Sequence, residues 1–467
     1  MSKLSNLLFF IGFLAVSSAL PAANEFVAYD QNAIAITNVT LIDGTGAEAK
    51  TQQTIIFEAG RIKEVGDTAS VTLPTGIHVI DGAGKSVIPG LVMMHEHMFY
   101  PTGNRNYTEM LYSFPRLYLS GGTTTLRTGG TMNPYADLAV RDAILQGKAI
   151  GPDIDVTAAY LNGPGLPIFK VNALDGPQDA RRMVTYWADE GVTSYKAYMH
   201  IRKDELQQVL EVAHSRGHKV TGHLCSITYR EAADLGMDNL EHGFFVASDF
   251  VDDKKENECP RGVRQSLVNL DVDSPEVNEL FKHLIKNDVA VTSTLTIFET
   301  YAKGRPLAYT DALDMLIPQA REQYLSRYEK IARSDNEDYA ILFDKMMAME
   351  KKFVDMGGTL LVGTDPTGYG GVVAGFASKR AIELLVESGF SLGHAIKIAS
   401  LNGASFLERS DEIGSIEQGK RADLVLVNGD LSEGIQAIRN MEAVFKNGVG
   451  YNPQEIHASV KGVVGLH

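Results

Sequence analysis

Short apolar runs separated by turn residues occur at both ends of the chain. Residues 35–42, 54–57 and 62–65 are runs of strand length, and the runs at 423–427 and 443–446 are each followed by an Asn-Gly pair. Asn-Gly and Asp-Gly pairs next to apolar runs are typical of β-hairpins. We therefore expect the two ends of the chain to form the halves of one small β-domain.

The middle of the chain has a different pattern, in which short apolar runs alternate with helical segments. Residues 204–216 and 379–388 are helical patterns, and in the first of them most apolar residues fall on one face. The strand candidates lie at 87–94, 123–127, 154–159, 193–197, 219–222, 239–240, 289–294 and 359–364. Eight strands that alternate with helices predict an α/β fold, a closed parallel (β/α)8 TIM barrel.

These patterns divide the chain into four parts. Residues 1–23 are expected to be a signal peptide, 24–88 and 406–467 the two parts of the small β-domain, and 89–405 the barrel. The stretch 250–274 is charged and irregular, and 298–352 is long and helical. Because the functional loops of such barrels lie at the C-terminal face, we expect both stretches to be insertions over that face.

The N-terminus has the features of a secretory signal peptide. Lys3 precedes an apolar run at 7–14, and small residues follow up to Ala19 and Ala23, where cleavage is expected. The run is shorter than the roughly 18–20 residues that a membrane span needs. We therefore expect an exported protein, periplasmic or secreted, with no membrane span after cleavage; a buried N-terminal helix is the alternative.

Composition and charge exclude some classes of function. The chain is 44% hydrophobic and 22% charged, which is close to the average of soluble globular proteins and unlike a disordered chain. Its net charge is −15. Because phosphate groups repel so acidic a chain, we expect no nucleic-acid partner. Cys225 and Cys259 could form one disulfide in an oxidising compartment, but Cys225 lies two residues after a candidate metal ligand, so buried free thiols are expected.

Residues able to bind a metal follow several of the predicted strands. Strand alternation places His95 and His97 on one face. In a parallel barrel the ends of different strands meet at one face, where reactive residues lie. A single His or Asp at a strand end is usually structural, but several that converge supply the ligands of a hydrolytic metal site. The residues concerned are His95, His97, His223, His242 and Asp365. Lys196, at the end of the fourth predicted strand, is expected to pair with an acid, because lysines are rarely buried unpaired.

These residues stand in motifs that resemble the amidohydrolase superfamily. The matching stretches are 87–97, which contains both His95 and His97, Gly222-His223, Glu241-His242-Gly243, 363–365 and 414–426. Within the superfamily the chain is similar to the imidazolonepropionase-like and prolidase-like metal-dependent hydrolases, from about residue 33 to about residue 450. The resemblance implies a metal-dependent barrel with a β-sandwich built from both chain ends.

The resemblance also implies a set of ligands for two divalent metals, with zinc expected. By resemblance, His95, His97 and Asp365 bind the first metal and His223 and His242 the second, while Lys196, carboxylated on Nζ, bridges the two. An ammonium group has no lone pair to offer near neutral pH, whereas a carbamate supplies two oxygens. Relatives without this lysine use one metal, so Lys196 decides between the two kinds of site. Glu96 departs from the apolar residue often found there; alternation points it away from the site, and the alternative is that it hydrogen-bonds and supports a metal ligand.

The function implied is cleavage of an amide C–N bond, with Asp365 as general base and then general acid. Export favours a dipeptide, an X-Pro peptide or an N-acyl amino acid as substrate. The alternatives are a mononuclear hydrolase or deaminase acting on a cyclic amide or ring amine, and a non-catalytic barrel scaffold. Whether the chain forms a homo-oligomer is left open. Arg127, which could equally form a structural ion pair, is a candidate substrate contact, together with Tyr160, Tyr198, His200, Tyr229 and Arg230.

Overall fold

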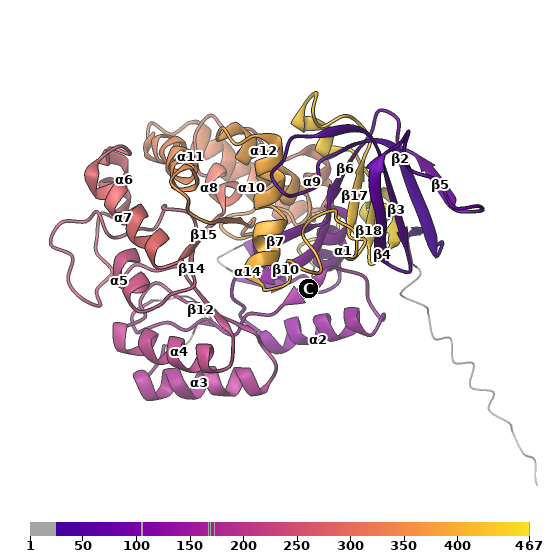
Figure 1. The fold of residues 1–467 in the computed structure, drawn as a ribbon. Helices are drawn as coiled ribbons and strands as arrows, with labels where there is room; N and C mark the ends of the chain where they lie inside the picture. Colours follow the sequence, from indigo (N-terminus) through magenta and orange to yellow (C-terminus); the bar gives the residue numbers. More distant parts are fainter. Residues whose placement is uncertain (1–24, 104–105, 167, 169, 172, 467) are drawn as a thin grey trace, which may run out of the picture.

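The computed structural model describes residues 25–466 except 104, 105, 167, 169 and 172. The predicted signal peptide at 1–23 lies outside the described residues. A small β-domain flanks a larger α/β domain (Figure 1). Within the described part of the chain, no helix combines the length and apolar character needed to cross a membrane.

The small domain is a nine-stranded sheet to which both chain ends contribute. The order is β1-β19-β18-β17-β6-β2-β3-β4, and β5 pairs with β2. β17 pairs antiparallel with β6, and this pairing joins the two chain ends. The strands are β1 (Val27–Tyr29), β2 (Ala33–Leu41), β3 (Lys50–Glu58), β4 (Arg61–Asp67), β5 (His78–Asp81), β6 (Ser86–Pro89), β17 (Leu424–Val427), β18 (Met441–Lys446) and β19 (Val449–Tyr451).

The sheet is buried on both faces where it meets the barrel. Along β17, Leu424 and Leu426 belong to the core of the small domain, whereas Val425 and Val427 belong to the main core of the barrel. This explains the unbroken apolar run of β17, because successive side chains of a strand point to opposite faces. The rings of Phe57 and Phe445, one from each end of the chain, lie 5.3 Å apart in the small core.

The barrel contains the eight parallel strands that the sequence predicts. They form two arcs, β11-β10-β7 and β12-β13-β14-β15-β16. The Ala158 amide donates to the Ser194 carbonyl at one seam, and the Asp365 amide donates to the His95 carbonyl at the other. The strands are β7 (Leu91–Glu96), β10 (Thr123–Thr128), β11 (Asp153–Asp155), β12 (Ser194–Ala197), β13 (Lys219–Gly222), β14 (Asn239–Glu241), β15 (Ala290–Ser293) and β16 (Leu360–Val362).

The first predicted barrel strand, 87–94, is divided between the two domains. Its beginning is β6 of the small sheet, and its end is β7 of the barrel. Gly90 separates them, and a side chain there would lie 2.3 Å from the Thr124 side chain. The single apolar run therefore conceals a change of sheet. The predicted domain limits at 88 and 405 stay predictions.

Helices cover the outside of the barrel (Figure 1). In α4, for example, Leu206, Val209, Leu210 and Ala213 form one buried face at helical spacing. The helices are α1 (Ser113–Ser120), α2 (Pro134–Leu145), α3 (Pro177–Asp189), α4 (Lys203–Ser215), α5 (Tyr229–Asp234), α6 (Val263–Asn269), α7 (Pro275–Lys286), α8 (Leu295–Glu299), α9 (Thr310–Met315), α10 (Pro318–Ala332), α11 (Asp338–Asp355), α12 (Phe376–Glu387), α13 (Leu392–Ile398), α14 (Leu401–Phe406), α15 (Pro453–Ser459) and the 3-10 helix η2 (Ile435–Arg439).

The predicted insertion at 298–352 needs correction. Its last helix, α11, stands between β15 and β16 and buries Phe343, Met346 and Phe353 in the barrel core. It is therefore an outer helix of the barrel rather than part of an insertion. A hairpin that the sequence pattern did not predict, β8 (Phe99–Gly103) with β9 (Asn106–Glu109), follows β7.

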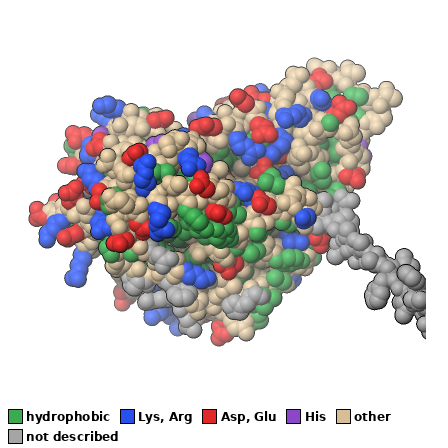
Figure 2. Space-filling view, turned by 90° about the horizontal axis from the view of Figure 1, so that it is seen from below, with side chains coloured by type: hydrophobic (Ala, Val, Ile, Leu, Met, Phe, Trp, Pro, Cys, Tyr) green, Lys and Arg blue, Asp and Glu red, His purple; other side chains and the backbone are tan. Residues whose placement is uncertain are grey.

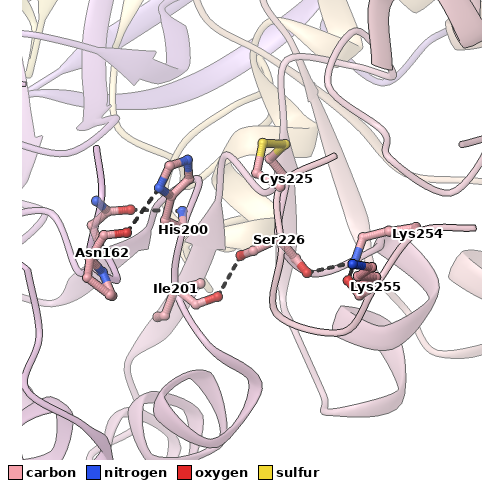
Figure 3. The surroundings of a disulfide bond; sticks show 9 residues. Asn162, His200, Ile201, Cys225, Ser226, Lys254 and Lys255 are labelled. Atoms are coloured by element: carbon pink, nitrogen blue, oxygen red, sulfur yellow. Dashed lines mark hydrogen bonds between the residues drawn. A yellow bond between two sulfur atoms is a disulfide. The ribbon is translucent and has the colours of Figure 1, made fainter. Parts of the chain in front are cut away.

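The prediction of free thiols was wrong, because Cys225 and Cys259 form a disulfide (Figure 3). The segment around Cys259 folds back onto the loop after β13, so that the two Cα atoms lie 4.8 Å apart. Lys254 from the same segment donates a hydrogen bond of 2.7 Å to the Ser226 carbonyl. Cys225 does not line the pocket that holds His223, so nearness to a candidate ligand in sequence did not prevent the cross-link.

The molecular surface mixes charges of both signs. On the face in Figure 2, acidic and basic side chains are interspersed, and hydrophobic side chains gather near the middle. The described residues of this face therefore present no extended basic field of the kind that binds nucleic acid.

Candidate metal centre

The six predicted ligands meet at the carboxyl ends of five barrel strands. His95 and His97 come from β7 and its end, and the others lie in or directly after β12, β13, β14 and β16. All six line one pocket of about 130 Å³ and are His95, His97, Lys196, His223, His242 and Asp365. The barrel topology thus brings together residues that are up to 270 positions apart in the sequence.

Three of these residues already have the geometry of a metal site. The ligand atoms of His95, His97 and Asp365 lie within 4.8 Å of one another, and all three residues are buried. Asp365 Oδ1 is 3.3 Å from His97 Nε2 and 3.9 Å from His95 Nε2. Imidazole and carboxylate groups are the ligands that zinc and related metals take in hydrolytic sites, so the donor set fits a divalent metal.

Hydrogen bonds to the outer ring nitrogens orient the histidines. His97 Nδ1 lies 2.9 Å from the Gly130 carbonyl and His95 Nδ1 2.7 Å from a Glu241 carboxylate oxygen. Because these oxygens only accept, each Nδ1 carries the proton and each Nε2 keeps its lone pair for the pocket. His242 Nδ1 lies 2.9 Å from the Thr294 hydroxyl.

The electrostatics of the pocket favour ligands that are ready to bind a cation. Burial lowers the pKa of His95 to about 4 and that of His223 to about 3, so both rings are neutral near pH 7. Burial would raise the pKa of Asp365, but hydrogen bonds from His97 and Thr367 lower it below its ordinary value. The Asp365 carboxylate is therefore ionised, whereas the His95 and His223 rings are neutral.

Lys196 differs from an ordinary buried lysine. Its side chain is 1% exposed, its Nζ makes no hydrogen bond to a described residue, and Glu241 Oε1 is 3.7 Å away. Burial lowers the pKa of Lys196 to about 8, although the charge of Glu241 opposes the shift. A buried amine that makes no hydrogen bond, has a lowered pKa and faces the pocket has the chemistry that carboxylation by CO₂ requires.

Glu241 is a functional residue that the sequence reasoning missed. Its buried carboxylate accepts hydrogen bonds from His95, from the Thr221 hydroxyl and from Arg127 Nη2, the last at 2.8 Å. The charges of Lys196 and Arg127 and the hydrogen bond from His95 hold the pKa of Glu241 well below its ordinary value against the effect of burial. The signal available was strand alternation, which directs an acid at 241 into the barrel opposite to Leu240.

Arg127 belongs to this network and not to the pocket wall. Its guanidinium is fully buried and also donates to Asn239 Oδ1 at 2.8 Å and to the Met94 carbonyl at 2.9 Å. Of the two interpretations that the sequence allowed, the structure shows the structural ion pair.

Glu96 points away from the ligands and is hydrogen-bonded to the segment that carries Asp365. Its carboxylate accepts hydrogen bonds from the amide and the hydroxyl of Thr364, the residue before Asp365. Burial raises the pKa of Glu96 to about 8. Asp365 itself has a φ of 51°, an unusual backbone conformation for a non-glycine residue that this anchoring supports.

Two of the candidate substrate contacts line the pocket. The rings of Tyr160 and Tyr198 lie 4.9 Å apart in its wall. Tyr229 is buried beneath the site, with its hydroxyl 3.0 Å from the Glu241 and Gly243 carbonyls. His200 lies outside the pocket wall, with Nδ1 3.2 Å from the Pro164 carbonyl, and the Arg230 amide donates to Asp249.

The rest of the pocket wall comes from residues that the sequence did not single out. They are predominantly apolar or aromatic, and several come from the β8–β9 hairpin and the loop after residue 161. These residues are Phe99, Tyr107, Gly129, Met132, Ile168, Val171 and Thr367.

Solved structures share this fold over nearly the whole chain. A Xaa-Pro dipeptidase with bound methionine in the active site has a TM-score of 0.68 at 20% identity, covering 90% of this chain and 100% of that one. A bottromycin amidohydrolase has a TM-score of 0.70 at 20% identity, covering 96% of this chain and 95% of that one. At such identities the likeness concerns the fold.

Similarity to curated proteins is local. Human (Homo sapiens) dihydropyrimidinase-related protein 5 is 28% identical over 198 residues, which are 40% of this chain and 33% of that protein. The dihydroorotase of Pelobacter propionicus is 32% identical over 99 residues, covering 21% of this chain and 22% of the enzyme. The chain thus aligns with a third or less of these proteins. The model of the amidohydrolase family, in contrast, matches residues 86–454, which include every candidate ligand. The chain therefore belongs to the amidohydrolase family.

Proposed function

We propose that this protein is a metal-dependent hydrolase that cleaves an amide C–N bond. One observation carries the proposal: His95, His97 and Asp365 converge in a buried pocket with His223, His242 and the amine of Lys196, which makes no hydrogen bond to a described residue. A barrel that served only as a scaffold would have no need of this convergence. Homo-oligomer formation stays a prediction.

The donor set divides into two adjacent positions. His95, His97 and Asp365 would hold one divalent metal, and His223, His242 and a carboxylated Lys196 would complete a second, with zinc the expected ion. The His223 and His242 rings lie 4.5 Å apart, and the His95 and His242 rings 4.8 Å, so the two positions adjoin. When bound, the metals would polarise a carbonyl oxygen and acidify water.

The residues of the chain then have separate tasks. Asp365, ionised and held by Thr367 at 2.8 Å, accepts a proton at its carboxylate and returns it to the leaving nitrogen. Glu241 and the Gly130 carbonyl keep the His95 and His97 rings oriented. The aromatic wall with Tyr160 and Tyr198 shields the reacting groups from water and contacts the substrate.

The substrate class that we favour is a dipeptide, an X-Pro peptide or an N-acyl amino acid. The apolar and aromatic pocket wall suits the side chain of such an amide. A second candidate is a cyclic amide, which is favoured by the local similarity to a dihydroorotase and to D-phenylhydantoinase from Escherichia coli, the latter 23% identical over 205 residues.

We also propose that the protein acts outside the cytoplasm. The Cys225–Cys259 disulfide supports this, because disulfides persist mainly in oxidising compartments. The apolar run at 7–14 after Lys3 supports it independently. Cleavage before residue 25 in the mature protein, measured by N-terminal sequencing, would establish export.

Asp365→Asn tests the catalytic proposal. The amide keeps the shape of the side chain but removes the proton acceptor, so turnover of a dipeptide panel should fall by about 10²–10⁴. Asp271→Asn, a change at an exposed aspartate, is the matched control and should keep full turnover. Wild-type turnover in Asp365→Asn would refute the assignment.

Metal content measured by elemental mass spectrometry separates the candidates. Two metals per chain after expression with zinc and bicarbonate would support the bridged site and linear amides. One metal with unmodified Lys196 would favour the cyclic amides. The absence of metal after reconstitution would contradict the hydrolase proposal itself.

A further inference from the structure

A second cavity lies away from the metal pocket, between α8, α9, α10, α12 and η2. Its volume is about 180 Å³. An engineered apolar cavity of about 150 Å³ in another protein binds benzene, so this cavity has room for one aromatic ring. Most of its wall is apolar and includes Leu307, Ala308, Ala312, Val372, Phe376 and Ala377.

An adjoining groove adds polar groups to this cavity. The two hollows share five lining residues, among them Tyr309, Phe376 and Arg439, and the groove is also lined by Lys379 and by Asp311. Lys379 is 3% exposed, and its Nζ lies 4.9 Å from the centre of the Phe376 ring. The Tyr309 hydroxyl is buried with no hydrogen-bond partner among the described residues.

The other cations around the cavity already have partners. Arg380 forms ion pairs with Glu299 and Glu383 at 2.6 and 2.8 Å, and Arg439 pairs with Glu383 at 2.6 Å. Lys379, by contrast, has no hydrogen bond or ion pair within 4 Å to any described residue; Asp311 and Glu383 act on it only from farther away. Its ammonium is thus the cation of this site that is left without a close anion.

A buried hydroxyl without a hydrogen-bond partner, as in Tyr309, is unusual, because buried polar groups in native proteins nearly always have one. The ammonium of Lys379, a residue that is 3% exposed, is a second donor at this hollow that makes no hydrogen bond to a described residue. A ligand that satisfies both must bring an acceptor, and a carboxylate also matches the charge of the ammonium. Burial lowers the pKa of Lys379 to about 8, so the side chain is still mostly protonated at neutral pH. The apolar cavity next to it accepts the rest of such a ligand.

We propose that this hollow is a second binding site, for a small carboxylic acid with a body the size of one aromatic ring. The ring occupies the cavity, and the carboxylate accepts hydrogen bonds from Lys379 Nζ and the Tyr309 hydroxyl. The proposal is independent of the proposed hydrolase function, because no metal ligand lines the cavity.

The site adjoins the loop that leads away from the metal centre. This loop begins at Asp365; Thr367 lines the metal pocket, and Gly371 and Val372 line the second cavity. Thr296, in the wall of the cavity, donates a hydrogen bond of 2.7 Å to the Thr364 carbonyl. A bound acid therefore contacts the same segment that carries a metal ligand.

The test is a titration of 3-phenylpropionate into the metal-loaded protein, measured by isothermal titration calorimetry. We expect one equivalent to bind, and 3-phenylpropanamide, which lacks the charge, to bind at least tenfold more weakly. Lys379→Met keeps the apolar stem and should weaken binding of the acid at least tenfold. Ala312→Leu fills the cavity from another part of its wall and should weaken binding of the acid to the same extent. If Lys379→Met does not fold, Ala312→Leu alone tests whether the acid binds in this cavity.

A carboxylate can also bind a metal centre, so the titration is repeated with Asp365→Asn. The second site predicts an unchanged affinity in this variant. The proposal would be overturned if Asp365→Asn lost binding or if the acid and the amide bound with equal affinity. It would also be overturned if neither cavity variant affected binding, or if no saturable binding occurred at millimolar concentration.

Discussion

At the scale of single residues, the site depends on Glu241, an acid that does not line the pocket. Glu241 joins the ring of His95 to the guanidinium of Arg127 and lies 3.7 Å from Lys196 Nζ. It therefore orients a metal ligand and neutralises a fully buried cation at once. Partners of this kind hold a metal ligand in the correct tautomer and direction.

Glu241→Gln should weaken the metal centre and the fold together. The amide leaves Arg127 without a buried counter-charge, which costs about 3–5 kcal/mol of unfolding free energy. Loss of the carboxylate from His95 Nδ1 should reduce metal affinity about 10–100-fold. Chelator competition and thermal unfolding measure the two effects separately.

Arg127→Met is the matched control for this variant. It breaks the same ion pair but leaves the contact between Glu241 and His95 in place. We expect lower stability with metal affinity near that of the wild type. Equal metal affinity in both variants would limit Glu241 to a structural role.

The ligands could be predicted from the sequence because each follows a strand, and parallel strands deliver their ends to one face. Their partners could not. Arg127 and Tyr229 also follow predicted strands, yet Arg127 turns into the barrel centre and Tyr229 lies beneath the site. The direction of a long side chain depends on which buried groups need a partner, and that follows from the assembled barrel.

At the scale of elements, a disulfide fastens the segment before α6 to the loop after β13. Cys259 is held on Cys225, and the neighbouring Ser226 hydroxyl donates to the Ile201 carbonyl at 2.6 Å (Figure 3). The loops that follow β12 and β13 and the segment around Cys259 thus form one connected layer. Tyr198 and His223, at the start of these loops, line the metal pocket.

Cys225→Ser combined with Cys259→Ser should destabilise this layer. The disulfide closes a loop with a sequence separation of 34 residues. In the chain-entropy model, opening such a loop costs about 3–4 kcal/mol. The variant should unfold at a lower temperature, and its amides near residue 259 should exchange faster with deuterium.

The wild type in reductant provides the control. Once thiol titration shows both cysteines reduced, its unfolding temperature should match that of the double variant, which itself should not respond to reductant. An unchanged unfolding temperature of the reduced wild type would contradict the role assigned to the cross-link.

Strands that are buried on both faces were predictable, because their apolar runs stand out from the helical patterns around them. The β8–β9 hairpin was not, since Phe99, Tyr107 and the polar residues between them give no clear alternation. α11 was misplaced for another reason. Its pattern is helical whether it covers a barrel strand or an inserted segment, and only the tertiary contacts distinguish the two.

At the scale of the whole molecule, the two domains are joined by ion pairs as well as by β6. Asp153, at the start of β11 in the barrel, pairs with Arg421 at 2.7 Å and with Lys446 of β18 at 2.8 Å. Arg409 adds a third contact at 3.2 Å. One barrel carboxylate thus contacts three cations contributed by the C-terminal part of the chain.

Asp153→Asn should uncouple the small domain from the barrel. Although burial raises it, the charges of Lys446 and Arg421 lower the pKa of Asp153 below its ordinary value of 3.8. The carboxylate therefore adds stability above that pH, and the contribution disappears as the pH falls through the lowered pKa. At neutral pH the variant leaves Lys446 without an anionic partner and removes one of the two carboxylates that Arg421 and Arg409 each contact, at a cost of about 1.5–3 kcal/mol. Calorimetry should show a lower unfolding temperature for the variant than for the wild type, and the difference between the two temperatures should narrow in acid.

Asp271→Asn is the control and should leave the unfolding profile unchanged. If the unfolding temperature of Asp153→Asn were lowered by the same amount at every pH, the ion pairs would not be what holds the domains together.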